Sequence, residues 1–307
     1  MERNYLGIEI GGTKLQFVSG GPAGRVIQRW RFPVDQTRGG AGIREQITSA
    51  LPGILTETGF SGIGVGFGGP VDWKTGQICC SHQIEGWADF QLGAWLQSLA
   101  RMPVRIDNDA NVAALGEALQ GAGPGFSPVF YVTLGSGVGG GLVVDGRIYH
   151  GAKPGESEIG HVCLDRSGTF VERRCSGWAV DTRIRESVTQ VPEGRLAQLV
   201  GKARSGEARF LAAALAEGDE LAWGILRETA GDLAFGLSHV VHLFHPEIIV
   251  IGGGLSLVGE PLRAAVEESL AKFVMEAFSP GPKVVLAALG EDAVPVGALA
   301  LAKRQPK

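Results

Sequence analysis

The 307-residue chain has a net charge of −4, with both signs scattered along its length. Nucleic-acid-binding proteins usually carry a basic stripe or tail, so this pattern argues against a nucleic-acid partner. No stretch reaches the roughly 18 uninterrupted apolar residues of a membrane span, and the first residues lack a signal-peptide pattern. The four cysteines do not fit a disulfide framework. We therefore expect a globular protein of the reducing cytoplasm, without a membrane partner and with about two domains.

Short apolar runs alternate with segments of helical periodicity along the chain. Residues 5–10, about 15–19 and about 25–32 predict three successive strands separated by glycine turns, and a helix is expected at about 40–57. "GIGVGFGG" (62–69) predicts another strand. A short strand ending at Asp107 precedes a helix that places Val112, Leu115 and Leu119 on one face. Strands alternating with helices indicate an α/β protein.

The same order of elements recurs in the second half of the chain. "FYVTLG", "GGGLVVDG" and "RIYHG", from about residue 129, predict strands that are followed by helices. Residues 225–244 have the apolar spacing of a helix, and "EIIVIGGG" (247–254) predicts a strand before a helix that begins near Gly259. Two halves that each open with a strand, a glycine loop and a second strand suggest a duplicated unit.

Many of the 48 glycines gather in loops at strand ends. "GIEIGGTK" (7–14) fits neither a Walker P-loop nor a dinucleotide fingerprint. Its backbone N–H groups and Lys14 can form an anion-binding nest, although a plain hairpin turn explains it equally well. "LGSGVGGG" (134–141) and "IGGG" (251–254) are similar loops. Three such loops in one chain favour a nucleotide held between two lobes.

Polar side chains gather where the strand of residues 103–107 ends. Asp107, Asn108, Asp109 and Asn111 are four polar residues within five positions at the mouth of a helix. One of them is expected to cap the helix, since Asp and Asn are favoured caps. Capping needs only one, and a carboxylate here can accept a proton from a substrate hydroxyl that the neighbouring amide orients. The stretch therefore predicts a catalytic role as well as a cap.

Taken together, these motifs resemble the ROK family (repressors, open reading frames and kinases) of bacterial sugar kinases. The resemblance covers nearly the whole chain, and its motifs follow the family's order: "GIEIGGTK", "GFGGPVD" (66–72), "IDNDANVAALGE" (106–117), "LGSGVGGGLVVDG" (134–146), "ESEIGH" (156–161) and "VIGGGLS" (250–256). It implies an actin-like ATPase fold of two RNase-H-like lobes with a cleft between them. The lobes would be residues 1–113 plus about 295–307, on the sugar and phosphate side, and residues 114–294, on the nucleotide side. The family is often dimeric, so a homodimer is expected.

The resemblance also implies ATP-dependent phosphorylation of a sugar, at O6 of a hexose such as glucose or of an N-acetylhexosamine. Asp109 matches the catalytic base, and the substrate-binding positions would be Gly69, Asn108, Asp109, Glu158, His161 and, depending on where a gap is placed, Glu172. The ATP contacts would be Gly11, Gly12, Thr13, Lys14, Gly135, Ser136, Gly137 and, on the adenosine side, Gly253 and Gly254. Glu9, where the family usually has Asp, and Asp109 are expected to hold hydrated Mg²⁺.

One stretch departs clearly from the family pattern. In "ESEIGHVCLDRSGTFVERRCSGW" (156–178) the zinc-binding cysteine cluster that often follows Gly-His is missing. His161, Cys163 and Cys175 make three ligands at best, whereas structural zinc takes four, usually with paired cysteines. We expect no zinc, and expect Cys163 and Cys175 to be small buried hydrophobes. Gln83 stands near the sugar pocket where the family pattern differs.

Three other functions remain open at this stage. The chain can be a kinase for a non-hexose substrate, or one that uses polyphosphate as donor, because the zinc segment is missing and Gln83 is unusual. A sugar-responsive transcriptional regulator of the same family is the third. Such regulators carry a DNA-binding helix-turn-helix before the first glycine loop, and here that loop begins at Gly11, so an enzyme is expected instead.

Overall fold

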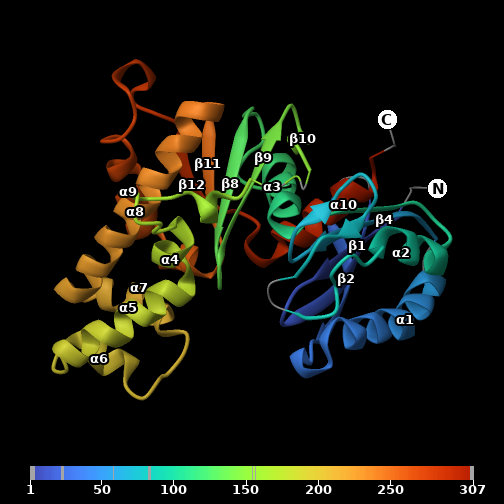
Figure 1. Ribbon diagram of the computed structural model, residues 1–307, viewed down its shortest axis with the longest axis horizontal. Coiled ribbons are helices and arrows are strands. Elements are labelled where there is room, and N and C mark those ends of the chain that lie inside the picture. Colours follow the sequence, from blue (N-terminus) through green and yellow to red (C-terminus); the bar gives the residue numbers. More distant parts are fainter. Residues whose placement is uncertain are drawn as a thin grey trace. The chain divides into compact units, whose positions relative to one another are not determined.

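The computed structural model describes residues 4–21, 24–57, 59–81, 84–153, 155 and 157–304, which form two compact units (Figure 1). Unit 1 consists of Met1–Pro124, Gly141–Ser157 and Glu291–Lys307, and unit 2 of Gly125–Gly140 and Glu158–Gly290. Among the described residues, two sheets have five strands each and a third has two. The fold is α/β, as the alternation of strands and helices predicts.

The first sheet belongs to unit 1 and has the order β3-β2-β1-β4-β7. Its strands are β1 (Asn4–Ile10), β2 (Lys14–Gly20), β3 (Val26–Pro33), β4 (Phe60–Phe67) and β7 (Val104–Asn108). The first three strands pair antiparallel through the predicted glycine turns, whereas β4 is parallel to β1 and β7 is parallel to β4. A separate two-stranded ribbon joins β5 (Val71–Asp72) to β6 (Gln77–Ile78).

The second sheet repeats the topology of the first, in the order β10-β9-β8-β11-β12. Its strands are β8 (Val129–Leu134), β9 (Val138–Val144), β10 (Arg147–Ile148), β11 (Ile248–Gly252) and β12 (Lys283–Leu286). Strands β8, β11 and β12 are parallel and lie in unit 2, whereas β9 begins in unit 2 and ends in unit 1. Both sheets thus follow the strand order third, second, first, fourth, fifth, in agreement with the predicted duplication.

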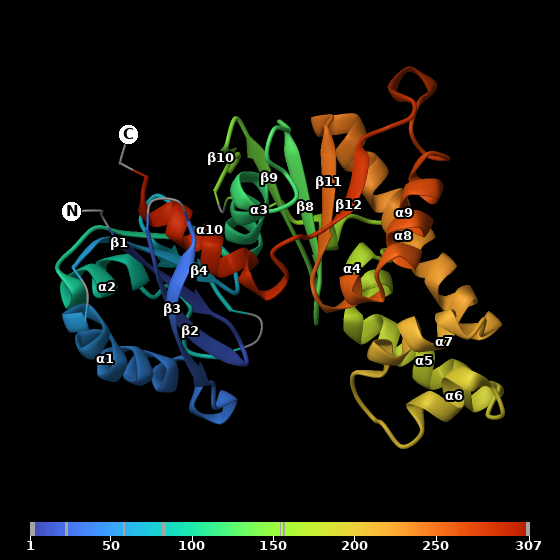
Figure 2. The same ribbon diagram turned by 180° about the vertical axis from the view of Figure 1, so that it is seen from behind.

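The helices of unit 1 cover both faces of its sheet (Figures 1 and 2). Helices α1 (Gly39–Glu57) and α2 (Leu92–Ala100) bury their apolar residues with those of the sheet in one core. Helices α3 (Asp109–Gln120) and α10 (Ala293–Ala302) pack on the other face. The C-terminal helix therefore closes the core of the unit that begins the chain.

Unit 2 is mostly helical outside its sheet. Its helices are α4 (Val171–Cys175), α5 (Gly177–Gln190), α6 (Arg195–Val200), α7 (Leu211–Ala216), α8 (Glu220–Phe244) and α9 (Glu260–Leu270). Helix α8 packs against α9 and α4; it begins five residues before the predicted start of 225, because Asp219 caps it by accepting a hydrogen bond from the amide of Ala222. No helix in the described part of the chain has the length and apolarity that a membrane span needs.

Strand β4 explains why "GIGVGF" alternates glycine with apolar residues. Side chains along a strand point to opposite faces in turn, and Ile63, Val65 and Phe67 enter the core shared with α1 and α2. The alternate positions face α10. A Cβ atom on Gly64 would lie 1.9 Å from the carbonyl oxygen of Ala298. Glycine is required there because the backbone of α10 lies directly on the backbone of the strand.

Helix α3 meets α10 through an equally close contact. A Cβ atom on Gly116 of α3 would lie 2.4 Å from the carbonyl oxygen of Ala293. A Cβ atom on Gly297 of α10 would lie 1.8 Å from the carbonyl oxygen of Val112. Two helices whose backbones touch in this way leave little freedom for either to shift, so α10 fixes the position of α3 on the sheet.

We predict that Gly297→Ala destabilises the protein. The added methyl group must push α10 away from α3, and overpacking of this kind costs about 1–3 kcal/mol of unfolding free energy. The matched control is Gly53→Ala within α1, where a Cβ atom would meet nothing within 4 Å. The control should be neutral or slightly stabilising, since alanine favours helix. Urea unfolding measures both variants, and equal stabilities would contradict the close packing of α3 on α10.

Candidate active site

Three parallel strands of the first sheet end at the same level, and the predicted site residues of unit 1 follow them. In the sheet register Ile10 at the end of β1 pairs with Phe67 of β4, and Phe67 pairs with Asn108 of β7. The next residues are the Gly11–Gly12 turn, Gly68–Gly69 and Asp109. In open α/β sheets, ligands bind at the carboxyl ends of the strands, so this edge is the candidate site of unit 1.

Asp109 is brought against the turns that follow the other two strands. It is the first residue of α3 and is half-buried. A Cβ atom on Gly68 would lie 3.4 Å from its Oδ2 atom and 3.5 Å from the carbonyl oxygen of Ile10. These are ordinary van der Waals distances, so the turn after β4 lies directly beside the carboxylate. The first turn of a helix also favours a negative charge, because the helix dipole is positive there.

Asn108 is the helix cap that the sequence left undecided among four polar residues. Its Oδ1 atom accepts hydrogen bonds from the amides of Ala110 at 2.9 Å and Asn111 at 3.3 Å. Its Nδ2 atom donates to the carbonyl oxygen of Gly69 at 3.2 Å. The predicted sugar-binding amide therefore also holds the start of α3 and the turn after β4.

Asp107 anchors the same turn from the buried side. Its side chain is only 3% exposed. Oδ1 accepts from the amide of Asn108 and from Nδ2 of Asn111, both at 3.0 Å. Oδ2 is 2.6 Å from Nε2 of His150. The sequence predicts Asp107 only as part of the polar stretch at the end of β7. It does not predict His150, which lies 43 positions away and belongs to no motif.

The first glycine loop is a tight hairpin turn between β1 and β2. The Gly11 amide donates to the Lys14 carbonyl oxygen at 3.0 Å, and Nε2 of Gln36 donates to the Gly12 carbonyl oxygen at 3.0 Å. Thr13 is exposed. The ammonium group of Lys14 lies 3.2 Å from the carboxylate of Glu9, which also accepts a hydrogen bond from Gln16. The positive charge of Lys14 is thus already compensated by Glu9.

In unit 2 the loop Gly135–Gly137, which also contains Ser136, is held by residues of the stretch that lacks the zinc cluster. Oε2 of Glu172 accepts a hydrogen bond from the amide of Val138 at 2.8 Å, and a Cβ atom on Gly137 would lie 2.5 Å from the same oxygen. The amide of Gly177 donates to the carbonyl oxygen of Gly135 at 2.7 Å. Glu172, predicted only as a substrate contact, is therefore built into the glycine loop.

Glu158 precedes the short 3₁₀ turn Ile159–His161 and His161 is its last residue; both are exposed. The amide of His161 donates to the carbonyl oxygen of Glu158 at 3.0 Å. The imidazole ring lies 5.7 Å from the ring of Phe170, centre to centre. Phe170 pairs with Cys163 in an isolated bridge, so a short hairpin supplies the neighbour of His161. Sequence reasoning had no candidate for that contact.

The third glycine loop follows β11 and leads into the 3₁₀ turn Gly254–Val258. Gly253 has a φ of 80°, and a Cβ atom there would lie 2.6 Å from the backbone of Leu134. Gly254 is exposed. The predicted helix near Gly259 is α9, for which Gly259 is the cap.

Of the two predictions that a cysteine is buried, one is confirmed and one is wrong. Cys175 is fully buried as expected, but Cys163 is exposed, so the prediction that it is a buried hydrophobe is wrong. The hairpin of residues 162–171 carries Cys163 on the surface, because the turn at Asp165 folds back on itself: the amide and hydroxyl of Ser167 both donate to Oδ1 of Asp165. Among the described residues no three His, Cys, Asp or Glu side chains gather as metal ligands would. Gln83 lies outside the described residues.

The sequence as a whole matches one family model. The model described as "ROK family" matches residues 5–305. The chain belongs to the ROK family. The predicted actin-like ATPase fold is confirmed, since the solved structures that superimpose on nearly the whole chain include a ROK family glucokinase and a ROK hexokinase.

Two relatives and one solved structure illustrate what this ROK protein is similar to. A glucokinase of Halalkalibacterium halodurans is 33% identical over 318 residues, which cover 99% of this chain and 96% of that one. The structure of a ROK family glucokinase from Streptomyces griseus in complex with glucose and AMPPNP superimposes with a TM-score of 0.86 at 28% identity, covering 98% and 100% of the two chains. A xylose repressor of Caldicellulosiruptor bescii is 28% identical over 80% of this chain and 63% of that one.

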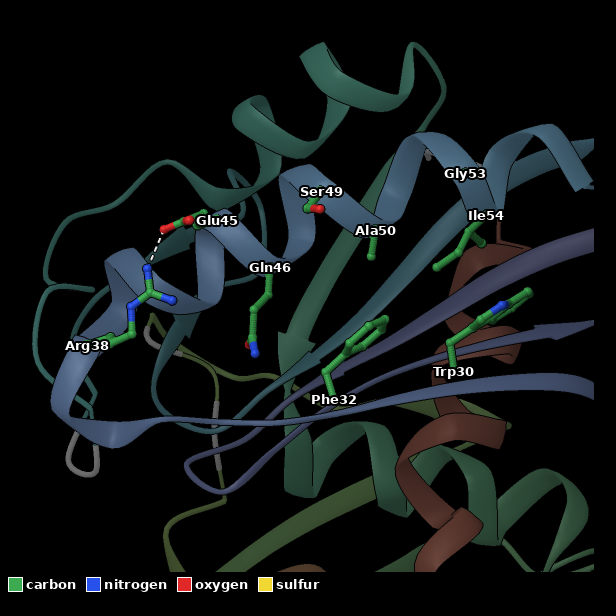
Figure 3. Close-up of a pocket in the computed structure, with 9 residues that line it drawn as sticks. All are labelled: Trp30, Phe32, Arg38, Glu45, Gln46, Ser49, Ala50, Gly53 and Ile54. Carbon is green, nitrogen blue, oxygen red and sulfur yellow. Dashed lines mark hydrogen bonds and ion pairs between the residues drawn. The ribbon is translucent and has the colours of Figure 1, made fainter.

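A separate pocket of this ROK protein lies in unit 1 between β3 and α1, with a volume of about 430 Å³ (Figure 3). Trp30 and Phe32 of β3 face Ile54 of α1 across it, and an ion pair between Arg38 and Glu45 lies at one end. None of the predicted site residues lines this pocket. Its position therefore gives no support to a role in the predicted reaction.

We predict that Asn108→Ala lowers the free energy of unfolding by about 1 kcal/mol, the usual effect of losing a helix cap. Asn108→Ser keeps a capping oxygen, although it also loses the contact with Gly69. The serine variant should therefore retain most of the stability that the alanine variant loses. Urea unfolding followed by circular dichroism measures the difference. Equal destabilisation by serine and alanine would show that the cap contributes nothing.

The two cysteines of unit 2 should differ in reactivity. Burial raises the pKa of the Cys175 thiol to about 12, and the thiolate is the form that reacts. Iodoacetamide applied to the native protein at a pH of about 8 should therefore label Cys163 and leave Cys175 unmodified, whereas both react in urea. Peptide mass spectrometry locates the label. Labelling of native Cys175 as fast as Cys163 would contradict its burial.

Proposed function

We propose that this ROK protein transfers the terminal phosphoryl group of ATP to O6 of a hexose, such as glucose, or of an N-acetylhexosamine. Its enzyme class, an ATP-dependent carbohydrate kinase, is supported by glucokinase relatives that match nearly the whole chain and by the fold. A ROK family glucokinase whose structure superimposes on nearly the whole chain was solved with glucose and the ATP analogue AMPPNP. These two ligands are the reason for proposing a hexose and ATP.

The observation that carries the proposal is the position of Asp109. Phosphoryl transfer depends mainly on positioning and charge stabilisation, and a general base must lie within hydrogen-bond reach of the proton it accepts. Asp109 stands at the carboxyl edge of three parallel strands, on a turn that Asn108 and Asp107 hold with five hydrogen bonds to main-chain and side-chain donors. We assign Asp109 as the base that takes the proton from the attacking hydroxyl.

The remaining predicted residues receive supporting roles. We propose that Asn108, Glu158 and His161, with the backbone of Gly69, orient the sugar by hydrogen bonds. Glu158 and His161 have exposed side chains, as a substrate contact requires. Glu172 already accepts a hydrogen bond from the amide of Val138, next to the glycine loop. A contact of Glu172 with the sugar, which we propose, would therefore place the sugar beside this loop.

The glycine loops are proposed to hold ATP. Gly11, Gly12, Thr13 and Lys14 in unit 1 and Gly135–Gly137 in unit 2 would contact the phosphates through backbone N–H groups. Gly253 and Gly254 would lie along the adenosine. The charge of Lys14 is shared with Glu9, so we expect the backbone to contribute more than the lysine to phosphate binding.

Mg²⁺ would accompany ATP, and the available donors fit it. Magnesium usually binds one or two carboxylates together with substrate phosphates and several waters, so a cluster of three protein ligands is not needed. Asp109 supplies one carboxylate. Glu9 is hydrogen-bonded by Gln16 and paired with Lys14, so it would hold the ion only through water. The bound ion would neutralise charge on the phosphate oxygens.

The proposed function is tested by an ADP-release screen over glucose, mannose, fructose, allose, N-acetylglucosamine and N-acetylmannosamine. We expect turnover with at least one hexose or N-acetylhexosamine, and formation of its 6-phosphate. Turnover with none of them would favour a non-hexose kinase, and turnover with polyphosphate but not ATP would favour that donor. Size-exclusion chromatography with light scattering tests the proposed homodimer.

Removing the proposed base should remove the reaction. Asp109→Asn keeps the size of the side chain but cannot accept the proton at neutral pH, and we expect kcat to fall by at least about 100-fold, within the range general-base catalysis contributes. Binding of ATP without Mg²⁺, measured by calorimetry, should change little, because Asp109 is proposed to hold the ion and not the nucleotide. Near-normal sugar phosphorylation by this variant would contradict the assignment.

A further inference from the structure

A chain of buried and half-buried side chains in unit 1 leads away from the proposed catalytic turn. Oδ2 of Asp107 is 2.6 Å from Nε2 of His150, and the two side chains are 3% and 16% exposed. The ring of His150 stacks on Trp73, with centres 4.1 Å apart and planes 13° from parallel. Asp107 is the penultimate residue of β7, His150 follows β10, and Trp73 follows β5. Three segments distant in sequence are therefore joined by one histidine.

The direction of the hydrogen bond follows from its chemistry. The other oxygen of Asp107 accepts from the amide of Asn108 and from Nδ2 of Asn111. An ionised carboxylate only accepts hydrogen bonds, so Nε2 of His150 is the donor. If His150 were replaced by a residue without this donor, Oδ2 of Asp107 would be a buried acceptor that has lost a hydrogen bond. Such a group raises the free energy of the folded state, and a shift of the turn toward solvent or another donor would relieve that cost.

The segment after His150 is fixed to the same turn a second time. Nδ2 of Asn111 also donates to the carbonyl oxygen of Gly155 at 2.8 Å. A Cβ atom on Gly155 would lie 2.8 Å from Cβ of His150 and 2.9 Å from Cδ1 of Trp73. Residues 150 and 155 are thus both hydrogen-bonded to the turn between β7 and α3. Glu158, a proposed sugar contact, follows Gly155 by three residues.

We propose that His150 is a positioning residue for the catalytic turn. Through Asp107 it fixes the backbone that carries Asn108 and Asp109, and it makes no contact with the substrate itself. The inference rests on the proposed function for its kinetic consequences, but its structural part concerns the turn alone. A histidine that merely stabilised the fold would change the free energy of unfolding without changing the turnover of the folded protein.

Three substitutions at position 150 separate the hydrogen bond from the stacking. His150→Phe keeps an aromatic ring for Trp73 and loses the donor. His150→Asn is polar and too short to reach Oδ2 of Asp107, so it serves should the phenylalanine variant fail to fold. His150→Gln places an amide donor near the position of Nε2. The measurements are kcat and KM for the sugar, well below the unfolding temperature of each variant, and amide hydrogen exchange of the segment 107–112.

We expect kcat to fall by about 10-fold or more in His150→Phe and His150→Asn, because even a small displacement of a catalytic group slows the reaction. The sugar KM should change by less than about threefold, and His150→Gln should recover most of kcat, because positioning acts on the transition state. Exchange in the segment 107–112 should be faster in the first two variants and close to wild type in the third. A kcat within about twofold of wild type in the phenylalanine and asparagine variants would overturn the proposal, as would a glutamine variant as slow as they are.

Hydrogen exchange distinguishes this proposal from the proposed function. Should the wild-type protein phosphorylate no sugar, the proposed function fails, and exchange alone then decides the role of His150. Unchanged exchange of the segment 107–112 in His150→Phe and His150→Asn would overturn the positioning role whatever the activity. Faster exchange restored by His150→Gln would support it.

Discussion

The structure of unit 1 depends on the direct contact between the backbone of α10 and the glycine face of β4. Because Gly62, Gly64 and Gly66 have no side chains, helix α10 packs directly on the backbone of β4. The same helix touches α3 at Gly297 and Gly116. Because interiors are close-packed and transmit displacement, the placement of α10 constrains the position of α3, whose first residue is the proposed base.

The turn at the start of α3 is held from several directions before any substrate arrives. Asn108 caps the helix and contacts Gly69, while Asp107 gathers donors from its own neighbours and from His150. Catalytic groups held in place beforehand need no reorganisation during the reaction. Unit 2 uses the same device at its glycine loop, where Glu172 and Gly177 each hold one backbone group. In both units, polar side chains and glycines together hold a loop at a strand end.

Much of the fold could be predicted because short stretches of sequence indicate where its strands and helices begin and end. Glycine turns between apolar runs predicted β1, β2 and β3, and the polar cluster after β7 predicted the start of α3. Helix α10 had no such signal: "AVPVGALALA" is apolar on every side and includes Pro295 and Gly297, so it lacks the polar face that marks a surface helix. The site could likewise be predicted only where the signal lies within a short stretch of sequence. Asp109 belongs to a compact motif, whereas His150 acquires its role only from Asp107, 43 residues away.

The exposed position of Cys163 shows the limit of residue type as a guide. Cysteine is among the most often buried residues, and Cys175 follows that rule in the contact of α4 with α8. Cys163 instead lies in a short hairpin whose turn is closed by Asp165, Ser167 and Thr169. Burial there depends on the local turn, and the spacing of the cysteines carries no information about it.

On the proposed mechanism, a turn that is held in place beforehand presents Asp109 to a sugar hydroxyl. A crystal structure of the protein with the sugar that gives the fastest turnover tests this arrangement. We expect a carboxylate oxygen of Asp109 about 2.6–3.2 Å from O6 of that sugar, with Asn108 still capping α3. A bound sugar whose O6 points away from Asp109, or a turn that rearranges to reach it, would contradict the assignment of Asp109 as the base.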